Sequence, residues 1–342
     1  MLDLPRDARA HPPRHRASAP PLAALAAGEA RAHRGSARSV QHHGVDTVER
    51  MSERLSYVAI TPARNEAERL PGIASCMIDQ VLRPQEWIIV DNGSTDETLA
   101  VATELAEQHS WITVLEVAGE AVPTRGGPVV RSFHAGLAKL RDPADIVVKL
   151  DADVSFDSDY FSVLLEGFSR DPSLGIAGGT SLERAPDGSW APSRLTANHV
   201  RGSVRAYRWA CLQQVTPLEE RMGWDGIDEL KAQVRGWRTR TLVDLSYYHY
   251  RVMGAREHGW LKWSRQGDMA HFMGYRVSYL LARTAYHMRR EPNAAAMLWG
   301  FALATLRRKP RCSEKAAIAQ LRQQQSLHAM PTRVREKLGL TV

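Results

Sequence analysis

The chain has 342 residues, of which 44% are apolar and 24% charged, and only three cysteines, none of them in a CxxC pair. This composition excludes a collagen-like or disulfide-rich protein, and the isolated cysteines argue against a zinc module and fit a reducing compartment. The net charge of +7 is unevenly spread, because residues 251–342 carry 17 Lys and Arg against five Asp and Glu, while residues 55–250 are acidic. The acidic centre suits cation binding, and the basic end suits an anionic surface.

Residues 1–54 are rich in Ala, Arg, His and Pro and lack the continuous apolar core of a secretory signal. We expect a disordered extension there. Met51 is an alternative start of the protein, because periodic structure begins just after it. No apolar run reaches the roughly 18 residues that a membrane-spanning helix needs.

From residue 57 onward, short apolar runs alternate with helical patterns. The apolar runs predict strands at residues 57–61, 86–90, 111–117 and 146–150. Helical periodicity predicts helices over residues 67–80 and 95–108, and a third that ends near residue 140. This alternation predicts an α/β domain at residues 55–250, with a mainly parallel sheet flanked by helices. Ligands of such sheets bind at the carboxyl ends of the strands, so the polar residues at 64–66, 91–92 and 151–153 are expected to converge on one edge.

Beyond residue 180 the pattern loosens. It indicates a long loop over residues 181–202, helices over 203–214 and 226–236, and a strand over 239–245. Residues 251–342 form a basic region that is helical and aromatic from residue 260.

Asp151 and Asp153 follow the fourth predicted strand and are separated by one small residue, Ala152. Two carboxylates placed in this way can both reach one hard cation, such as Mg²⁺ or Mn²⁺, which keeps open positions for phosphate oxygens. Such an ion would neutralise the charge that builds on a departing diphosphate. The alternative is a solvated turn, since Asp-x-Asp is common by chance.

Two further motifs precede this pair, Pro62-Ala63-Arg64-Asn65-Glu66 and Val90-Asp91-Asn92-Gly93-Ser94-Thr95-Asp96. Together with Asp151-Ala152-Asp153, in this order and spacing, they resemble family 2 glycosyltransferases, which are inverting enzymes of the GT-A fold. The resemblance covers residues 57–153. The Asn-Gly turn and helix caps at Ser94 or Thr95 are structural roles compatible with binding.

The resemblance implies a role for each of these positions. Asp91 would recognise the nucleobase, while Glu66 and the adjoining backbone would hold the base or ribose. Asp153 would be the principal metal ligand, and Asp151 would contact ribose or metal. The implied donor site comprises Pro62, Arg64, Asn65, Glu66, Asp91, Asn92, Asp151 and Ala152. Arg131, after a Gly-Gly pair, lies where the family often has a basic residue; it is expected to contact a phosphate or to be a solvent-exposed arginine.

A second region resembles the family around Asp225, which lies eleven residues before Gly236. In the family a Glu-Asp pair at this spacing supplies the catalytic base, and here Trp224 replaces the Glu. The resemblance makes Asp225 the expected base, and its structural alternative is a helix N-cap worth about 1 kcal/mol. Asp228, one helical turn further on, is the reserve candidate.

His249 follows the strand after that helix. Several GT-A enzymes place a histidine there as a metal ligand or diphosphate contact, and the alternative is a purely structural histidine. Arg251 is a second candidate contact for the diphosphate.

The resemblance implies a metal-dependent inverting transferase. It would move a sugar from a UDP-, GDP- or dTDP-linked donor to a saccharide or lipid-linked acceptor, in cell-envelope or extracellular polysaccharide synthesis in the cytoplasm. One alternative is a sugar-nucleotide nucleotidyltransferase, which would carry a Gly-rich loop with Arg and Lys where Arg64-Asn65-Glu66 stands. A non-catalytic nucleotide-sugar-binding protein is the other alternative, left open by Trp224.

Residues 268–288 and 293–306 are apolar helical patterns with basic ends, at Arg289-Arg290 and Arg307-Arg308-Lys309. We expect the first to pack on the catalytic domain and the second to lie on the inner face of the cytoplasmic membrane, where anionic lipids attract basic residues. A nucleic-acid partner is not expected, because no recognised binding module accompanies the charge.

Overall fold

The computed structural model describes residues 55–119, 126–140, 144–185, 187–193, 199–251 and 259–326. The extension predicted over residues 1–54, and with it the question of a start at Met51, lies outside the described residues.

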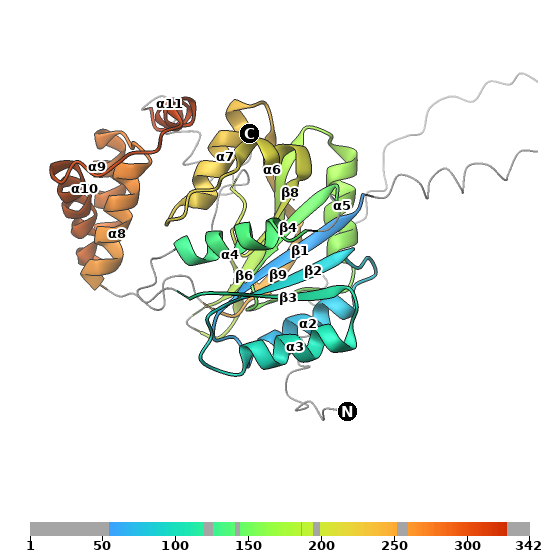
Figure 1. The fold of residues 1–342 in the computed structure, drawn as a ribbon. Helices are drawn as coiled ribbons and strands as arrows, with labels where there is room; N and C mark the ends of the chain where they lie inside the picture. Colours follow the sequence, from blue (N-terminus) through green and yellow to red (C-terminus); the bar gives the residue numbers. More distant parts are fainter. Residues whose placement is uncertain are drawn as a thin grey trace, which may run out of the picture. The chain divides into compact units, whose positions relative to one another are not determined.

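One mixed sheet forms the centre of the protein (Figure 1), and within the described residues it has nine strands. The strands are β1 (Tyr57–Ala63), β2 (Glu86–Asn92), β3 (Ile112–Val117), β4 (Ile146–Leu150), β5 (Val154–Ser155), β6 (Leu174–Arg184), β7 (Trp190–Pro192), β8 (Val204–Arg208) and β9 (Arg238–His249). Their order is β3-β2-β1-β4-β8-β6-β9-β5, with β7 paired to β6. Strands β1 to β4 are parallel to one another, as predicted, whereas β8 runs antiparallel to both β4 and β6.

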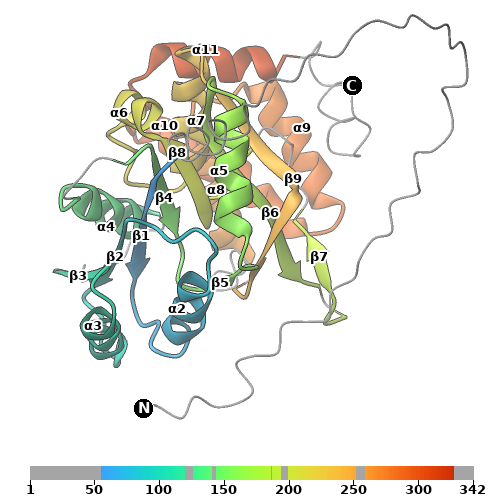
Figure 2. The same ribbon diagram turned by 90° about the vertical axis from the view of Figure 1, so that its right-hand side faces the viewer.

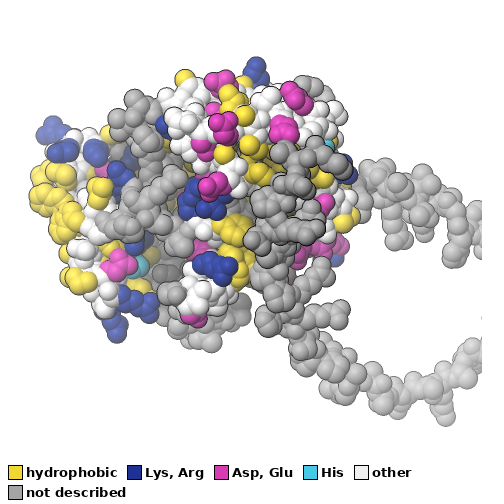
Figure 3. Space-filling view, turned by 90° about the horizontal axis from the view of Figure 1, so that it is seen from below, with side chains coloured by type: hydrophobic (Ala, Val, Ile, Leu, Met, Phe, Trp, Pro, Cys, Tyr) yellow, Lys and Arg dark blue, Asp and Glu magenta, His cyan; other side chains and the backbone are white. Residues whose placement is uncertain are grey.

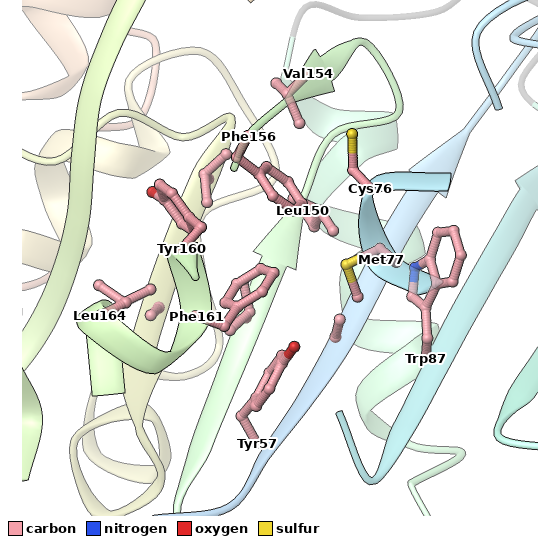
Figure 4. Close-up of a cluster of buried hydrophobic side chains, with 14 of the residues drawn as sticks. Tyr57, Cys76, Met77, Trp87, Leu150, Val154, Phe156, Tyr160, Phe161 and Leu164 are labelled. Atoms are coloured by element: carbon pink, nitrogen blue, oxygen red, sulfur yellow. The ribbon is translucent and has the colours of Figure 1, made fainter. Parts of the chain in front are cut away.

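Helices cover both faces of this sheet (Figure 2). One face carries α2 (Leu70–Ile78), α3 (Thr98–Gln108) and α5 (Tyr160–Arg170), and the other carries α4 (Gly127–Leu137), α6 (Trp209–Val215) and α7 (Trp224–Val234). Successive residues of a strand point to opposite faces. In β1, accordingly, Tyr57 packs in the core on the side of α2, α3 and α5 (Figure 4). The next residue, Val58, packs in the core on the side of α4, α6 and α7. The central strands β1 and β4 are buried on both faces, and their sequences are accordingly mostly apolar.

Two predictions beyond residue 180 are wrong in part. The expected helix over 203–214 begins only at Trp209, because residues 204–208 form β8 and pair with the edge of β4 that faces away from β1. The expected loop over 181–202 contains the end of β6 and the short strand β7. In both segments the pairing with a neighbouring strand outweighs the weak local preference of the sequence.

The C-terminal region contains α8 (Gly259–Phe272), α9 (Val277–Met288), the short 3₁₀ helix η2 (Pro292–Ala295), α10 (Ala296–Leu306) and α11 (Lys315–Gln324). The helix predicted over 268–288 is two helices, separated at Gly274, whose φ of +68° lies in the left-handed region that ends helices. Helices α8 and α10 cross closely: a Cβ on Gly267 would lie 2.0 Å from the Met297 carbonyl oxygen.

The C-terminal helices share a hydrophobic core with the catalytic part. Ile227 and Leu230 of α7 pack with Phe272 of α8 and Leu321 of α11. No helix in the described ranges is long and apolar enough to cross a membrane.

Candidate active site

The loops after β1 and β2 are joined by hydrogen bonds that run in both directions. The Asn65 backbone N–H donates to Ser94 Oγ at 3.0 Å, and the Thr95 N–H donates to Asn65 Oδ1 at 2.8 Å. The Glu66 N–H donates to Thr98 Oγ1 at 2.7 Å, which fixes the loop against the start of α3. The two motifs that were read separately in the sequence therefore form one structural unit.

Asp91 lies at the end of β2 and is 2% exposed. Its Oδ2 accepts a hydrogen bond from the Ser94 N–H at 3.1 Å, whereas Oδ1 is buried and has no hydrogen-bond partner among the described residues. Buried carboxylate oxygens are normally hydrogen-bonded. The bare oxygen is thus suited to accept a hydrogen bond from a ligand.

Asp151, Asp153 and His249 come together at the ends of β4 and β9. One ligand atom from each lies within 4.8 Å of the others, and within the described ranges this is the one group of acidic, His and Cys side chains that could hold a metal ion. His249 Nε2 lies 3.5 Å from Asp153 Oδ1, and Asp153 and His249 are both buried. Two carboxylates and one imidazole fit Mn²⁺ well and Mg²⁺ less closely, because Mg²⁺ prefers oxygen ligands and retained waters.

Positive side chains surround this acidic cluster. Lys149 Nζ forms an ion pair with Asp151 and donates a 2.6 Å hydrogen bond to the Gly202 carbonyl. Arg251 forms a two-pronged ion pair with Glu66, with both N···O distances at 2.8 Å, and its Nε lies 3.6 Å from Asp153 Oδ2. The Glu66 loop and the cluster of Asp151, Asp153 and His249 are therefore joined by Arg251.

The two aspartates differ in their acidity. Burial raises the pKa of Asp151, although the Lys149 ammonium opposes the shift. Burial would also raise the pKa of Asp153, but the hydrogen bond and charge of His249 and the charge of Arg251 outweigh it and hold that pKa below its usual range. Asp153 is thus the more readily ionised of the two carboxylates. Its role as the principal metal ligand stays a prediction.

Asp225 lies in the first turn of α7, beside the segment that leads into β8. A Cβ on Gly202 would lie 3.6 Å from Asp225 Oδ2 and 2.9 Å from the Trp224 ring. The Asp151 N–H donates to the carbonyl of the next residue, Ser203, at 2.8 Å. Residues 202–203 consequently lie close both to Asp225 and to the backbone of Asp151.

Asp228 is 1% exposed and faces the interior. Its Oδ1 lies 2.6 Å from Arg205 Nη2, and its Oδ2 accepts hydrogen bonds from Arg205 Nε and the Tyr207 hydroxyl. Burial raises the pKa of Asp228 to about 7, against the opposing charge of Arg205. That pKa alone would suit a base, but the burial of Asp228 and the hydrogen bonds to both of its oxygens favour Asp225. The choice between the two aspartates stays a prediction.

The remaining candidates have simpler surroundings. Pro62 lies in β1 opposite Val90, and Ala152 is buried between the two aspartates. Arg131 forms a 2.9 Å ion pair with Glu220, so a phosphate contact would have to compete with that carboxylate. Arg64 follows β1 and is half-buried. Their roles in donor binding stay predictions.

Sequence reasoning missed two buried cations, Lys149 and Arg205. Each stands in a strand whose neighbours are apolar or aromatic, IVVKL for β4 and VRAYR for β8. A basic residue inside a buried strand signals a fixed counter-ion. Lys149 supports Asp151, and Arg205 supports α7 through Asp228 and the Asp225 carbonyl.

A histidine near α7 makes a testable contribution to stability. His199 Nδ1 lies 2.9 Å from Glu229 Oε2. Burial would lower the pKa of His199, but Glu229 and, more weakly, Asp225 outweigh the effect of burial and raise it. A raised folded-state pKa stabilises the protein fully below the ordinary histidine pKa of about 6.5 and loses this effect as the pH rises through the folded value.

We therefore expect the free energy of unfolding to fall across that window in the native protein and to fall less in His199→Gln. Urea denaturation at pH values on both sides of the window measures the difference. Parallel pH profiles for the two proteins would contradict the assignment.

Comparisons with known proteins bear on this site. Residues 58–282 match the model of Glycosyl transferase family 2. Poly-beta-1,6-N-acetyl-D-glucosamine synthase of Staphylococcus aureus is 22% identical over 217 residues, which cover 63% of this chain and 45% of the synthase. The 4,4'-diaponeurosporenoate glycosyltransferase of Staphylococcus haemolyticus is 26% identical over 123 residues, 35% of this chain and 30% of that enzyme. The chain thus matches less than half the length of either relative.

A solved structure confirms the fold class predicted from the sequence. The mannosyltransferase of Pyrobaculum calidifontis, determined in complex with GDP-Man and Mn²⁺, superposes with a TM-score of 0.50 at 17% identity over 84% of each chain. At this identity the likeness shows the fold alone.

Proposed function

The chain belongs to glycosyl transferase family 2, and from that membership we propose that it is a metal-dependent inverting glycosyltransferase with a nucleotide-sugar donor. One observation carries the proposal: the Asp151, Asp153 and His249 cluster lies against the Glu66 loop through Arg251. A cation site in contact with the loop expected to hold a nucleoside suits a substrate that carries a diphosphate between nucleoside and sugar.

Different side chains bind different parts of the donor. Asp91, with its bare buried oxygen, accepts a hydrogen bond from the nucleobase, and Glu66 holds the base or ribose. Asp151, Asp153 and His249 would hold Mn²⁺ or Mg²⁺, which offsets the charge of the leaving diphosphate. Arg251 is close enough to Asp153 to add a second positive charge there. Arg64 and Arg131 are further contacts for the donor.

Asp225 serves as the base. Its carboxylate takes the proton of the acceptor hydroxyl while that oxygen bonds to the anomeric carbon. The bond from this carbon to the diphosphate oxygen breaks on the opposite face, so the electron pair leaves with the nucleoside diphosphate and the configuration inverts. Holding the reactants in line supplies much of the acceleration.

We infer a saccharide or lipid-linked acceptor and a role in the synthesis of cell-envelope or extracellular polysaccharide. The names of the relatives support this setting, since one makes a glucosamine polymer and the other glycosylates diaponeurosporenoate. We place the enzyme itself in the cytoplasm. The three cysteines are free and buried, which fits a reducing compartment.

The test measures thermal stability and donor hydrolysis with Mn²⁺ and a panel of UDP-, GDP- and dTDP-sugars. A donor at about 100 times its Kd is expected to stabilise the folded protein by about 2.7 kcal/mol. Asp153→Ala should lose both the metal-dependent stabilisation and the hydrolysis. Asp244→Ala removes an exposed aspartate from β9 and should keep them.

Each alternative has its own outcome. Release of pyrophosphate from a nucleoside triphosphate and a sugar phosphate would identify a nucleotidyltransferase. Donor binding without hydrolysis or transfer to any acceptor would identify a binding protein. Equal stabilisation with and without Mn²⁺ would show that the metal is not required for donor binding.

A further inference from the structure

The C-terminal helices expose an unusual number of large apolar side chains. Twelve such side chains are exposed in the described residues, and eight of them lie on α8, α9 and α10. We call these eight the C-terminal patch: Trp260, Leu261, Val277, Leu281, Tyr286, Met288, Trp299 and Leu306. Exposed apolar residues that stand singly need no explanation, whereas a gathering of them marks an interaction surface.

Packing among the helices does not require these side chains. The core between α8, α9 and α10 consists of other residues, including Trp263, Leu280 and Met297. Trp299 and Leu306 are seven residues apart and lie on the same side of α10. Trp299 is 54% exposed and Leu306 is 79% exposed. A different face of α10 packs on α8: a Cβ on Gly300 would lie 1.9 Å from the Ser264 carbonyl oxygen. The side of α10 that carries Trp299 and Leu306 is therefore not needed for packing against α8.

The same helices are strongly basic. Residues 259–326 carry twelve Lys and Arg against three Asp and Glu. All three acids are already paired within the protein: Asp268 with Arg221 and Lys309, Glu291 with Lys262, and Glu314 with Arg235. Exposed arginines remain at the helix ends, at positions 289, 290, 307, 308 and 311. Figure 3 shows basic and apolar side chains next to each other over this part of the molecule.

We propose that the C-terminal patch binds the surface of an anionic lipid bilayer without spanning it. Trp and Tyr favour the boundary between headgroups and acyl chains, and helices that combine such residues with Lys and Arg lie in that plane. Arginines beside the patch would pair with lipid phosphates. Pairing with a second copy of this chain is disfavoured, because two surfaces with a surplus of nine positive charges repel each other.

The bilayer proposal stands on the helices alone and does not require the donor chemistry. If the proposed transferase function also holds, binding to a bilayer narrows the class of acceptor. An enzyme held on a bilayer is placed for a lipid-linked acceptor rather than a soluble saccharide. Loss of vesicle binding and loss of sugar transfer are separate measurements, so either proposal can fail while the other stands.

The experiment is co-sedimentation of the full chain with vesicles of phosphatidylcholine, with and without phosphatidylglycerol, at low and high ionic strength. We expect binding to the anionic vesicles that weakens as salt is raised. Arg289→Glu/Arg290→Glu should weaken partitioning by at least about 30-fold, since each basic residue near an anionic surface contributes roughly fivefold. Trp299→Ser/Leu306→Ser should also weaken it, at low and high salt alike.

A matched control removes exposed apolar side chains from the catalytic part. Val81→Ser/Val243→Ser, at positions 67% and 63% exposed, should bind vesicles like the native chain. Circular dichroism melts check that each variant is folded. Failure of the native chain to sediment with anionic vesicles at low salt would overturn the proposal. So would a finding that Trp299→Ser/Leu306→Ser abolishes self-association in light scattering and leaves vesicle binding unchanged.

Discussion

Asp225→Asn is expected to lower kcat for sugar transfer by roughly 10²- to 10⁴-fold while leaving donor binding unchanged. The substitution preserves size and removes the charge that would take the acceptor proton. Asp225 is not one of the three residues of the candidate metal site, Asp151, Asp153 and His249. The thermal stabilisation by Mn²⁺ and donor should therefore match that of the native protein, and loss of a favourable charge in the first turn of α7 costs only about 1 kcal/mol.

Asp228→Asn is the matched control, since the same change is made one helical turn away. Its carboxylate is buried against Arg205 and Tyr207, so the expected result is lower stability with a nearly normal kcat per folded molecule. Urea denaturation and steady-state kinetics on both variants separate the two effects. Transfer that survives in Asp225→Asn and fails in a fully folded Asp228→Asn would show the base assignment to be wrong.

The strand ends that carry the expected donor residues could be predicted from the sequence, because they are built locally. Asp91 lies at the end of β2, and Glu66 lies in the loop that follows β1. Parallel strands bring their ends to one edge whatever the rest of the fold does. The same reasoning placed Asp151 and Asp153 after β4. Apolar runs, turns and strand ends are all features of short range, so they can be read in order along the chain.

The acceptor side could not be read in that way, because its contacts join distant segments. Arg205 meets Asp228 across 23 residues. The expected donor side also has one such long-range contact, because Arg251 meets Glu66 across 185 residues. Strand β8 looked helical because its strand character comes from pairing with β4 rather than from its own residues. In the sequence, only the resemblance to the family ranks Asp225 above Asp228. The structure adds that Asp228 is 1% exposed and hydrogen-bonded to Arg205 and Tyr207.

Arg205→Met is expected to lower the free energy of unfolding by about 3–5 kcal/mol, among the largest single effects available in this chain. The Arg205 side chain is fully buried and is bonded to Asp228, Glu229, and the carbonyls of Val200 and Asp225. Methionine fills much of the same volume but leaves two carboxylates inside the protein without their counter-ion. The urea midpoint of the purified variant, compared with the native chain, measures this loss.

The control is Arg170→Met, which breaks an ion pair on α5 whose side chains are 75% and 54% exposed. This change should lower the free energy of unfolding by less than about 1 kcal/mol.

The loss of unfolding free energy in Arg205→Met should also depend on pH. In the native protein the raised pKa of Asp228, about 7, means that stability falls as the pH rises toward 7 and then levels off. Without Arg205 that pKa rises further, so the variant keeps losing stability above pH 7 and the gap widens there. A deficit equal to that of Arg170→Met, or one that narrows above pH 7, would show that Arg205 is not the counter-ion that stabilises the N-terminal turns of α7.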